Sequence, residues 1–199
     1  MNAAYREVLG DSTRLRPASW GFTEDELRRR YRWSQDDLLQ YWSGSIPGGR
    51  DFEHFKDSVR ERDWPADGHR ISYAIREKAS NRLIGMVSVY GIDRATGSGE
   101  IGIYVGEKDL WGHGYGTDAL VAFLRHLFSD LDFRSVYLHT YQSNIRAQRS
   151  YVRVGFRTVE TKRRYAPRIG YHDEVKMEIS RERFTQLHGP ARRPVAASS

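Results

Sequence analysis

Three glycines separated by single residues, Gly112, Gly114 and Gly116, form the stretch of the sequence with the clearest chemical meaning. Glycine has no side chain, so the backbone of such a loop can bend sharply and come close to a ligand. Apolar residues at helical spacing follow, which predicts a helix whose unpaired N–H groups and positive dipole end face that ligand. Phosphates are the natural occupants of this position. A glycine-rich turn without a ligand is the structural alternative.

The spacing does not match the two best-known phosphate loops. In the dinucleotide-binding fingerprint the last glycine falls one residue later, and the loop follows the first strand of a βαβ unit. A P-loop would continue as Gly-Lys-Ser/Thr, whereas Gly116 is followed by Thr117 and Asp118. The sequence therefore predicts a phosphate-binding loop of another kind.

A second motif lies further along the chain and contains Asn144, Ala147, Tyr151 and the pair Gly155-Phe156. Residues 111–120, Trp-Gly-His-Gly-Tyr-Gly-Thr-Asp-Ala-Leu, resemble the acyl-CoA pyrophosphate loop of the GNAT acetyltransferases, and the second motif resembles the family's Asn-x-x-Ala-x-x-x-Tyr-x-x-x-Gly-Phe pattern. The family usually has Gln or Arg where this chain has Trp111. Tryptophan is frequent there in the RimJ/RimL-like and spermidine-acetyltransferase branches. The resemblance covers residues 83–177.

The resemblance implies one α/β (α+β) domain, with a mixed central sheet of about six to seven strands that is splayed in the middle and flanked by helices. The splay would lie between strands 100–105 and 136–140 and hold the pantetheine arm of acetyl-CoA, the co-substrate. The implied cofactor-binding residues are Ile103, Tyr104, Val105, Trp111, Gly112, His113, Gly114, Tyr115, Gly116, Thr117 and Asn144. Asn144 also suits a helix N-cap, and the two roles are compatible. A strand N–H, such as that of Tyr104, is implied as the oxyanion donor.

The implied reaction is direct attack of a neutral primary amine on the acetyl thioester. A lysine-like amine has a pKa near 10.4, so at pH 7 about one molecule in 2500 is neutral and a base must take the proton. Glu100 is similar in position to the catalytic glutamate of histone-type GNATs. His139, on the next strand, is the rival base, because histidine titrates near neutral pH. An ion-paired strand carboxylate and a packed strand histidine are the structural alternatives.

Tyr151 is the strongest catalytic candidate in the sequence. In the family, the tyrosine at this motif position donates a proton to the departing thiolate. A core tyrosine on an amphipathic helix is the alternative, but Asn144 and Gly155-Phe156 stand in register with it. The resemblance therefore implies that Tyr151 is the general acid.

Substrate choice is expected to come from the amino-terminal helices and the last hairpin. The amino-terminal region contains four aromatic residues and two aspartates, Tyr31, Trp33, Tyr41, Trp42, Asp36 and Asp37. Such a wall would suit a cationic amine. Aromatic residues at helical spacing are nevertheless more typical of a core, and paired aspartates are more typical of a solvated face. We predict acetyl transfer to a small polyamine or related amine. RimJ/RimL-like acetylation of protein amino termini, or a non-catalytic acyl-CoA-binding module, are the alternatives.

Hydrophobic periodicity, together with the residues that break helices and strands, predicts the elements that must position these residues. Thr23 and Glu26 have the spacing of a capping box, which predicts a helix start. Further helices are expected near residues 38–41, 51–60, 114–128 and 144–154. Strands are expected at residues 13–17, 71–75, 83–90, 100–105 and 135–140, and a late hairpin at residues 156–159 and 174–179.

Composition sets outer limits on the fold. The chain has 199 residues, of which 39% are hydrophobic and 29% are charged, the balance of one compact domain. We assign that domain to residues 1–187 and expect a disordered tail at residues 188–199, which are rich in Pro, Ala, Arg and Ser. There are no cysteines, so disulfides, thiolate catalysis and cysteine-based metal sites are excluded, and no metal is expected.

Charge and hydropathy limit the partners. The net charge of +6 suits a polyanion, but the basic residues are scattered along the chain, so no nucleic-acid partner is expected. No apolar run is long enough to span a bilayer, and the first residues lack the apolar core of a signal peptide. We therefore expect a cytoplasmic protein with no membrane partner. The oligomeric state stays open, with a homodimer as one option.

Overall fold

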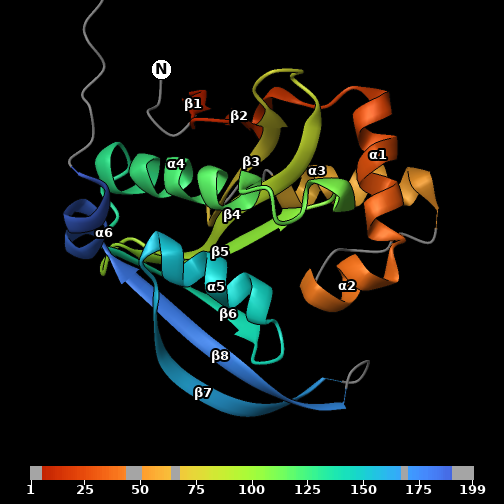
Figure 1. Cartoon of the computed structure of the whole chain (residues 1–199). Helices are drawn as coiled ribbons and strands as arrows, with labels where there is room; N and C mark the ends of the chain where they lie inside the picture. Colours follow the sequence, from red (N-terminus) through yellow and green to blue (C-terminus); the bar gives the residue numbers. More distant parts are fainter. Residues whose placement is uncertain (1–5, 44–50, 64–67, 167–169, 190–199) are drawn as a thin grey trace, which may run out of the picture.

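The computed structural model describes residues 6–43, 51–63, 68–166 and 170–189 (Figure 1). One eight-stranded sheet runs through the molecule in the order β1-β2-β3-β4-β5-β6-β8-β7. Its strands are β1 (Val8–Leu9), β2 (Thr13–Pro17), β3 (Arg70–Glu77), β4 (Leu83–Asp93), β5 (Ser98–Val105), β6 (Ser135–Tyr141), β7 (Arg157–Ala166) and β8 (Gly170–Ser180). The predicted mixed sheet is confirmed, with one strand more than expected, because the two-residue β1 is too short to show a pattern.

Six α-helices and two short 3-10 segments accompany the sheet in the described residues. The helices are α1 (Glu24–Ser34), α2 (Asp37–Ser43), α3 (Phe52–Asp63), α4 (Tyr115–Ser129), α5 (Ile145–Val154) and α6 (Arg181–His188), and the 3-10 segments are η2 (Ala18–Trp20) and η3 (Lys108–Leu110). Helix α6 was not predicted, because its eight residues bury only Phe184. Residues 190–199, most of the predicted disordered tail, lie outside the described residues.

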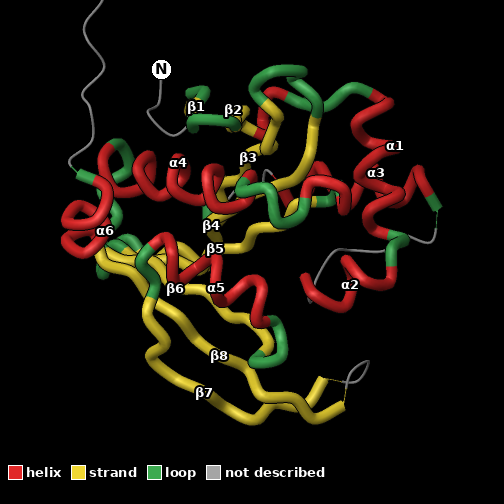
Figure 2. The backbone as a smooth tube through the Cα atoms, viewed as in Figure 1, coloured by secondary structure: helices red, strands yellow, loops and turns green. Residues whose placement is uncertain are grey.

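The amino-terminal capping box is formed as predicted. The Thr23 hydroxyl accepts from the N–H of Glu26, and the Glu26 carboxylate accepts from the N–H of Thr23, so both orphan donors at the start of α1 are satisfied. The late hairpin is longer than predicted, since β7 and β8 extend to Ala166 and from Gly170. The side chains of β7 are almost all exposed, and a charged, exposed strand does not show the apolar alternation by which strands are recognised. Figure 2 shows this hairpin at one edge of the sheet.

Helices cover both faces of the sheet. Alternate residues of a strand point to opposite faces, and β3 shows this: Tyr73 and Ile75 belong to the core under α4, whereas Ala74 belongs to a smaller core with Trp33 of α1. Helix α4 also contacts α5, β2 and β5. The amino-terminal helices and the α4–α5 pair therefore pack on different faces. In the described part of the chain, no helix is both long and apolar enough to cross a membrane.

Candidate active site

The sheet opens between β5 and β6, the one parallel pair among its neighbouring strands. A single register pair, Glu100 with Tyr137, joins these strands in the described residues, whereas β4 and β5 remain paired from Gly85 with Val105 to Tyr90 with Glu100. Beyond Glu100 the backbone edge of β5 that faces β6 is therefore free of sheet partners. The predicted splay is present, and two cavities lie along it.

The first cavity, which we call the glycine-loop cavity, has a volume of about 450 Å³. The glycine loop and the start of α4 form one wall, and α5 forms the other. Gly112 and Gly114 have φ values of +84° and +89°, a backbone region that is costly for other residues, and a Cβ at either position would point into open space. Helix α4 begins immediately after Gly114, and no side chain caps it. The wall thus offers exposed backbone and free N–H groups.

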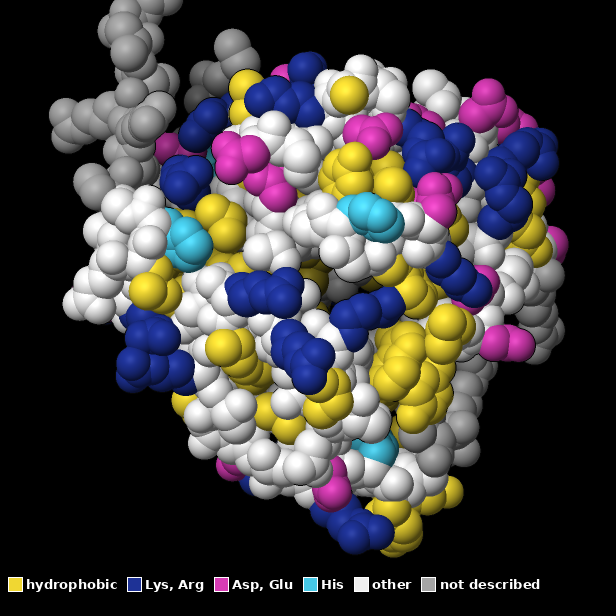
Figure 3. Space-filling view, in the orientation of Figure 1, with side chains coloured by type: hydrophobic (Ala, Val, Ile, Leu, Met, Phe, Trp, Pro, Cys, Tyr) yellow, Lys and Arg dark blue, Asp and Glu magenta, His cyan; other side chains and the backbone are white. Residues whose placement is uncertain are grey.

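The α5 wall of this cavity is cationic. Arg146, Arg149 and Arg153 line it, and no described carboxylate lies within ion-pair distance of any of the three. Figure 3 shows Lys and Arg side chains gathered around the hollow between α4 and α5. Free cations and a helix N-terminus on opposite walls make a site for a phosphorylated ligand.

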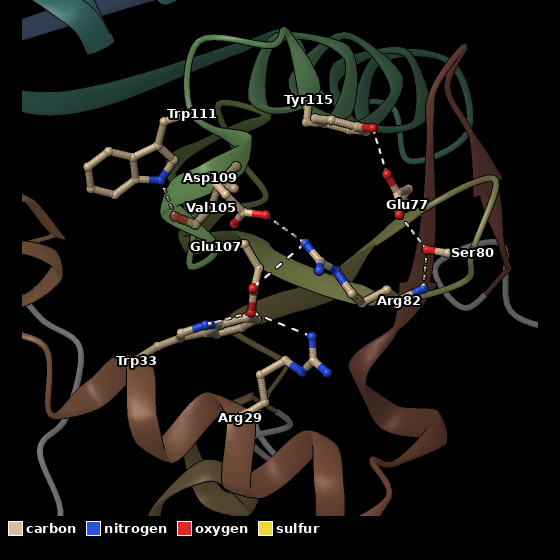
Figure 4. Close-up of polar contacts among 10 residues, drawn as sticks. All are labelled: Arg29, Trp33, Glu77, Ser80, Arg82, Val105, Glu107, Asp109, Trp111 and Tyr115. Carbon is tan, nitrogen blue, oxygen red and sulfur yellow. Dashed lines mark hydrogen bonds and ion pairs between the residues drawn. The ribbon is translucent and has the colours of Figure 1, made fainter.

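The remaining predicted loop residues have different surroundings. Thr117 and Tyr115 line the glycine-loop cavity, but the Tyr115 hydroxyl donates to Glu77 Oε1 at 2.7 Å, which holds the phenol against β3 (Figure 4). His113 is exposed, lines neither cavity, and has its Nδ1 3.1 Å from the carbonyl oxygen of Trp111. Of the predicted loop residues, His113 is the one that the structure leaves away from both cavities.

The second cavity, which we call the amino-terminal cavity, has a volume of about 420 Å³ and lies under α1, α2 and the end of α3. The two cavities meet at a shared set of residues: Ile103, Tyr104, Val105, Trp111, Arg146, Ala147 and Tyr151. Trp111 Nε1 donates to the carbonyl oxygen of Val105 at 2.8 Å, and the Arg146 guanidinium lies 3.8 Å from the centre of the Trp111 ring. This contact bridges the loop and α5 at the junction.

Tyr151 stands at the junction and lines both cavities. Its ring packs at 6.0 Å from the ring of Phe156, the last residue of the second motif. Burial raises the pKa of Tyr151 to about 12, against the opposing effect of Arg146. The phenol is therefore protonated at neutral pH and can act as a proton donor.

Glu100 and His139, which the sequence presented as rival bases, are hydrogen-bonded to each other. His139 Nδ1 lies 2.9 Å from Glu100 Oε1, and His139 lines the amino-terminal cavity whereas Glu100 does not. The parallel register of Glu100 with Tyr137 brings them together, and this register cannot be seen in the sequence. Burial and the nearby Glu100 carboxylate raise the pKa of Tyr90, which therefore stays protonated beside the pair.

Asn144 fills the N-cap role and still faces the cavity. Its Oδ1 accepts from the N–H of Ala147 at 3.2 Å, which caps α5. The side chain lines the amino-terminal cavity, and no residue that the structure describes accepts a hydrogen bond from Asn144 Nδ2. This amide N–H is therefore available to a bound ligand.

The aromatic and acidic residues of the amino-terminal region mostly have the structural roles that their spacing favoured, and of the six only Trp42 lines the amino-terminal cavity. Tyr31 packs against Phe52 and Phe55 of α3. Asp36 accepts from two N–H groups at the start of α2 and pairs with Lys108 at 2.6 Å. These side chains stabilise the amino-terminal helices instead of facing a ligand. Tyr41 and Asp37 are exposed outside the cavity.

Trp33 is buried and fixes α1 over the end of β5. Its indole rests on Gly106, where a Cβ would lie only 2.1 Å from the ring, and its Nε1 donates to Glu107 at 3.2 Å. Arg29 and Arg82 also pair with Glu107, as Figure 4 shows. This junction holds the roof of the amino-terminal cavity against the strand that lines both cavities.

Sequence reasoning missed a charged cluster in the amino-terminal cavity. Arg30, Arg62, Asp63 and Arg70 line it from α1, α3 and β3. The one available signal was that Arg30, Trp33 and Ser34 occupy the buried face of α1 at helical spacing. Residues 28–30 are all arginine, so that signal does not show that Arg30, and not its neighbours, is the buried one.

Comparisons with known proteins agree with this geometry. Residues 14–157 match the family model for the acetyltransferase (GNAT) domain. Comparison of the sequence with functionally curated proteins finds no significant match. Among solved structures, spermidine N-acetyltransferase from Vibrio cholerae in complex with CoA and spermine is similar, with a TM-score of 0.74, 18% identity, and coverage of 87% of this chain and 98% of that chain.

Two further solved structures share the fold, with similar TM-scores and sequence identities. RimJ from Mycobacterium smegmatis, in complex with CoA-disulfide, has a TM-score of 0.72 and 20% identity, with 90% of each chain covered. A GCN5-related N-acetyltransferase from Brucella melitensis has a TM-score of 0.73 and 21% identity, covering 92% of this chain and 82% of that chain. The family model covers well over half of the sequence, and this chain therefore belongs to the GNAT acetyltransferase family.

Proposed function

We propose that this chain is an N-acetyltransferase that moves an acetyl group from acetyl-CoA to a primary amine. The observation that carries the proposal is the meeting of two cavities at Tyr151, one built for phosphates and the other roofed by the amino-terminal helices. A transfer enzyme of this kind must bind two substrates from opposite sides of one reacting centre.

The residues of the glycine-loop cavity fit CoA. Gly112 and Gly114 leave open space where side chains would block a close approach, and the uncapped start of α4 offers N–H groups to a pyrophosphate. Arg149 and Arg153 supply positive charge on the opposite wall. The unpaired edge of β5 at Ile103–Val105, together with Asn144 Nδ2, would hold an extended amide-containing arm in the splay. When bound, acetyl-CoA supplies an activated acetyl thioester.

The chain's own residues would then manage protons and charge. His139 would take the amine proton at Nε2, with Glu100 holding Nδ1 and so fixing the tautomer. Tyr151 Oη would give the proton that the departing thiolate needs, a role supported by its pKa of about 12. The N–H groups on the free edge of β5, those of Ile103 and Val105, would face the developing oxyanion. The N–H of Tyr104, which the resemblance implied, is excluded from this role: Gly106 N–H donates to the carbonyl oxygen of Ile84, and by strand alternation the N–H of Tyr104 also points toward β4.

For the acceptor, the neighbouring structures support two classes of amine. One neighbour is a spermidine acetyltransferase solved with spermine and another is RimJ. The cavity itself gives little support to a polyamine, because Asp63 is its one described Asp or Glu and is already paired with Arg30 and Arg62. We therefore propose a primary amine as the acceptor and do not restrict it to a polyamine.

The test is thiol release from acetyl-CoA across a panel of polyamines, amino acids, aminoalkyl phosphates and short peptides, with mass spectrometry of the acceptor. We expect release of free CoA with acetylation of one acceptor class. No release with any acceptor, in a protein whose melting temperature acetyl-CoA raises, would contradict the enzymatic proposal and favour a non-catalytic acyl-CoA-binding module. No thermal shift would contradict the CoA site itself.

A further inference from the structure

The end of the amino-terminal cavity away from the glycine loop contains an unusual charge cluster. Arg30 comes from α1, Arg62 and Asp63 from the last turn of α3, and Arg70 from the start of β3, and all four line the cavity. Three guanidinium groups therefore surround a single carboxylate. Among the described lining residues there is no other Asp or Glu, and the other cationic or titratable groups are Arg146, His139 and three tyrosines.

The single carboxylate is fully occupied by two of the arginines. Arg30 Nη2 lies 2.6 Å from Asp63 Oδ2, and Arg62 Nε lies 3.1 Å from Asp63 Oδ1. Burial alone would raise the pKa of Asp63, but the charges of Arg30 and Arg62 outweigh it and hold the pKa below its usual value. Asp63 is therefore ionised, and the cluster keeps a net charge of about +2 by the ordinary charge states of its four members.

Several donors of the cluster have no acceptor. Arg30 is 1% exposed, yet its Nε and Nη1 have no hydrogen-bond partner among the described residues, and the same holds for the buried Nη1 of Arg62. The guanidinium of Arg30 also lies 4.5 Å from the Phe22 ring centre and beside the Tyr104 phenol, which adds a polar contact but no carboxylate. Buried donors without acceptors are costly, and a site for an anion resolves that cost.

Arg70 differs from the other two arginines of the cluster, which are paired with Asp63. It forms no ion pair with a described residue, and its guanidinium lies 4.7 Å from the centre of the Tyr90 ring. Burial lowers the pKa of Arg70, and the charge of Arg62 lowers it further, while Asp63 opposes both. Arg62 and Arg70 thus face the same cavity, and Asp63, already bonded to Arg30 and Arg62, is the one described carboxylate that lines it.

We propose that the amino-terminal cavity binds an acceptor amine that carries an anionic group, a carboxylate or a phosphate, held by Arg62 and Arg70 at the end opposite the glycine loop. This rests on the proposed function, and it names the substrate class. The amine would lie toward His139 and Tyr151, and the unpaired Arg30 donors would support the anion site from behind. The cavity volume of about 420 Å³ suits a small molecule of this kind. A polyamine in the same place would bring further positive charge to the arginines.

The test uses matched acceptors that differ by one anionic group: ornithine with putrescine for a carboxylate, and O-phosphoethanolamine with ethanolamine for a phosphate. We expect kcat/KM to be about 10- to 100-fold higher for the anionic member of at least one pair, the range for losing a hydrogen bond to a charged group. The pair that shows the difference identifies the anion. Arg70→Gln should remove that advantage mainly by raising KM for the anionic member.

Arg157→Gln is the matched control, because Arg157 is exposed on β7 and lines neither cavity. If the anionic member has no advantage in either pair, or if Arg70→Gln does not change the advantage, the anionic-acceptor proposal is overturned while the acetyltransferase proposal stays intact. If no amine releases CoA, the proposed function fails separately. Calorimetric titration of the same pairs into the CoA-bound protein then decides: tighter binding of an anionic member, lost in Arg70→Gln, supports the anion site, and equal binding overturns it.

Discussion

The two cavities differ in what defines them. The glycine-loop cavity depends on backbone, with two glycines at positive φ and an uncapped helix start, and its arginines lie on a single helix. The amino-terminal cavity depends on side chains that come from four helices and four strands, with an arginine cluster around Asp63. A cavity built from backbone geometry suits a ligand that stays the same when side chains are substituted. A cavity built from dispersed side chains can become specific for another ligand when one of those side chains is substituted.

The largest expected effect is at the junction of the cavities. Tyr151→Phe should lower kcat about 10²- to 10⁴-fold, because it removes the proton donor but keeps the ring that packs on Phe156. Steady-state thiol release measures the loss, and the dissociation constant for CoA should stay unchanged. Wild-type turnover in Tyr151→Phe would remove Tyr151 from the mechanism.

The next effect concerns the hydrogen-bonded pair at the splay. His139→Ala should lower kcat about 10²-fold, since it removes the base that faces the amino-terminal cavity. Glu100→Gln should cost less, about 10-fold, because Gln still accepts a hydrogen bond from His139 Nδ1 but carries no charge to stabilise the imidazolium. The pH dependence of kcat/KM in both variants is the measurement. A larger loss for Glu100→Gln than for His139→Ala would reverse these roles.

The local motifs of the site could be predicted from the sequence, whereas contacts between distant residues could not. The glycine loop, the capping box at Thr23 and the Asn144 cap could be predicted, because each depends on residue types a few positions apart. The Glu100–His139 pair and the Arg30 cluster could not, because a parallel register and the packing of α1 and α3 near β3 join residues distant in the sequence. The cap that Asp36 forms and its pair with Lys108 could not be predicted for the same reason, since both depend on where α2 packs.

A smaller effect is expected from the arginines of the glycine-loop cavity, which should act on CoA binding and not on acceptor binding. The double variant Arg149→Ala/Arg153→Ala should weaken CoA binding about 10-fold and reduce its salt dependence, because exposed phosphate contacts are screened by salt. Acceptor KM should not change. Calorimetry at two salt concentrations checks this, with Arg157→Ala as the control. An equal loss in the control would indicate only a general charge effect.

The smallest effect is expected when the pH is raised, because Tyr151 should stay protonated. With a pKa of about 12, Tyr151 stays protonated as pH rises from 7 to 10, where about 1% would be ionised, so it should cause no loss of kcat in that range. The difference in phenolate absorbance between wild type and Tyr151→Phe should titrate near pH 12. A difference that titrates near pH 10 would contradict the buried, proton-donating state.

The most direct test of the account is a crystal structure of the protein with CoA and the preferred acceptor. The account predicts the pyrophosphate at the start of α4 beside Gly112 and Gly114, the sulfur within hydrogen-bond distance of Tyr151 Oη, and the anionic group of the acceptor on Arg62 and Arg70. A CoA sulfur distant from Tyr151, or an acceptor with its cationic end at these arginines, would contradict the division of the cleft into a phosphate side and an anionic-acceptor side.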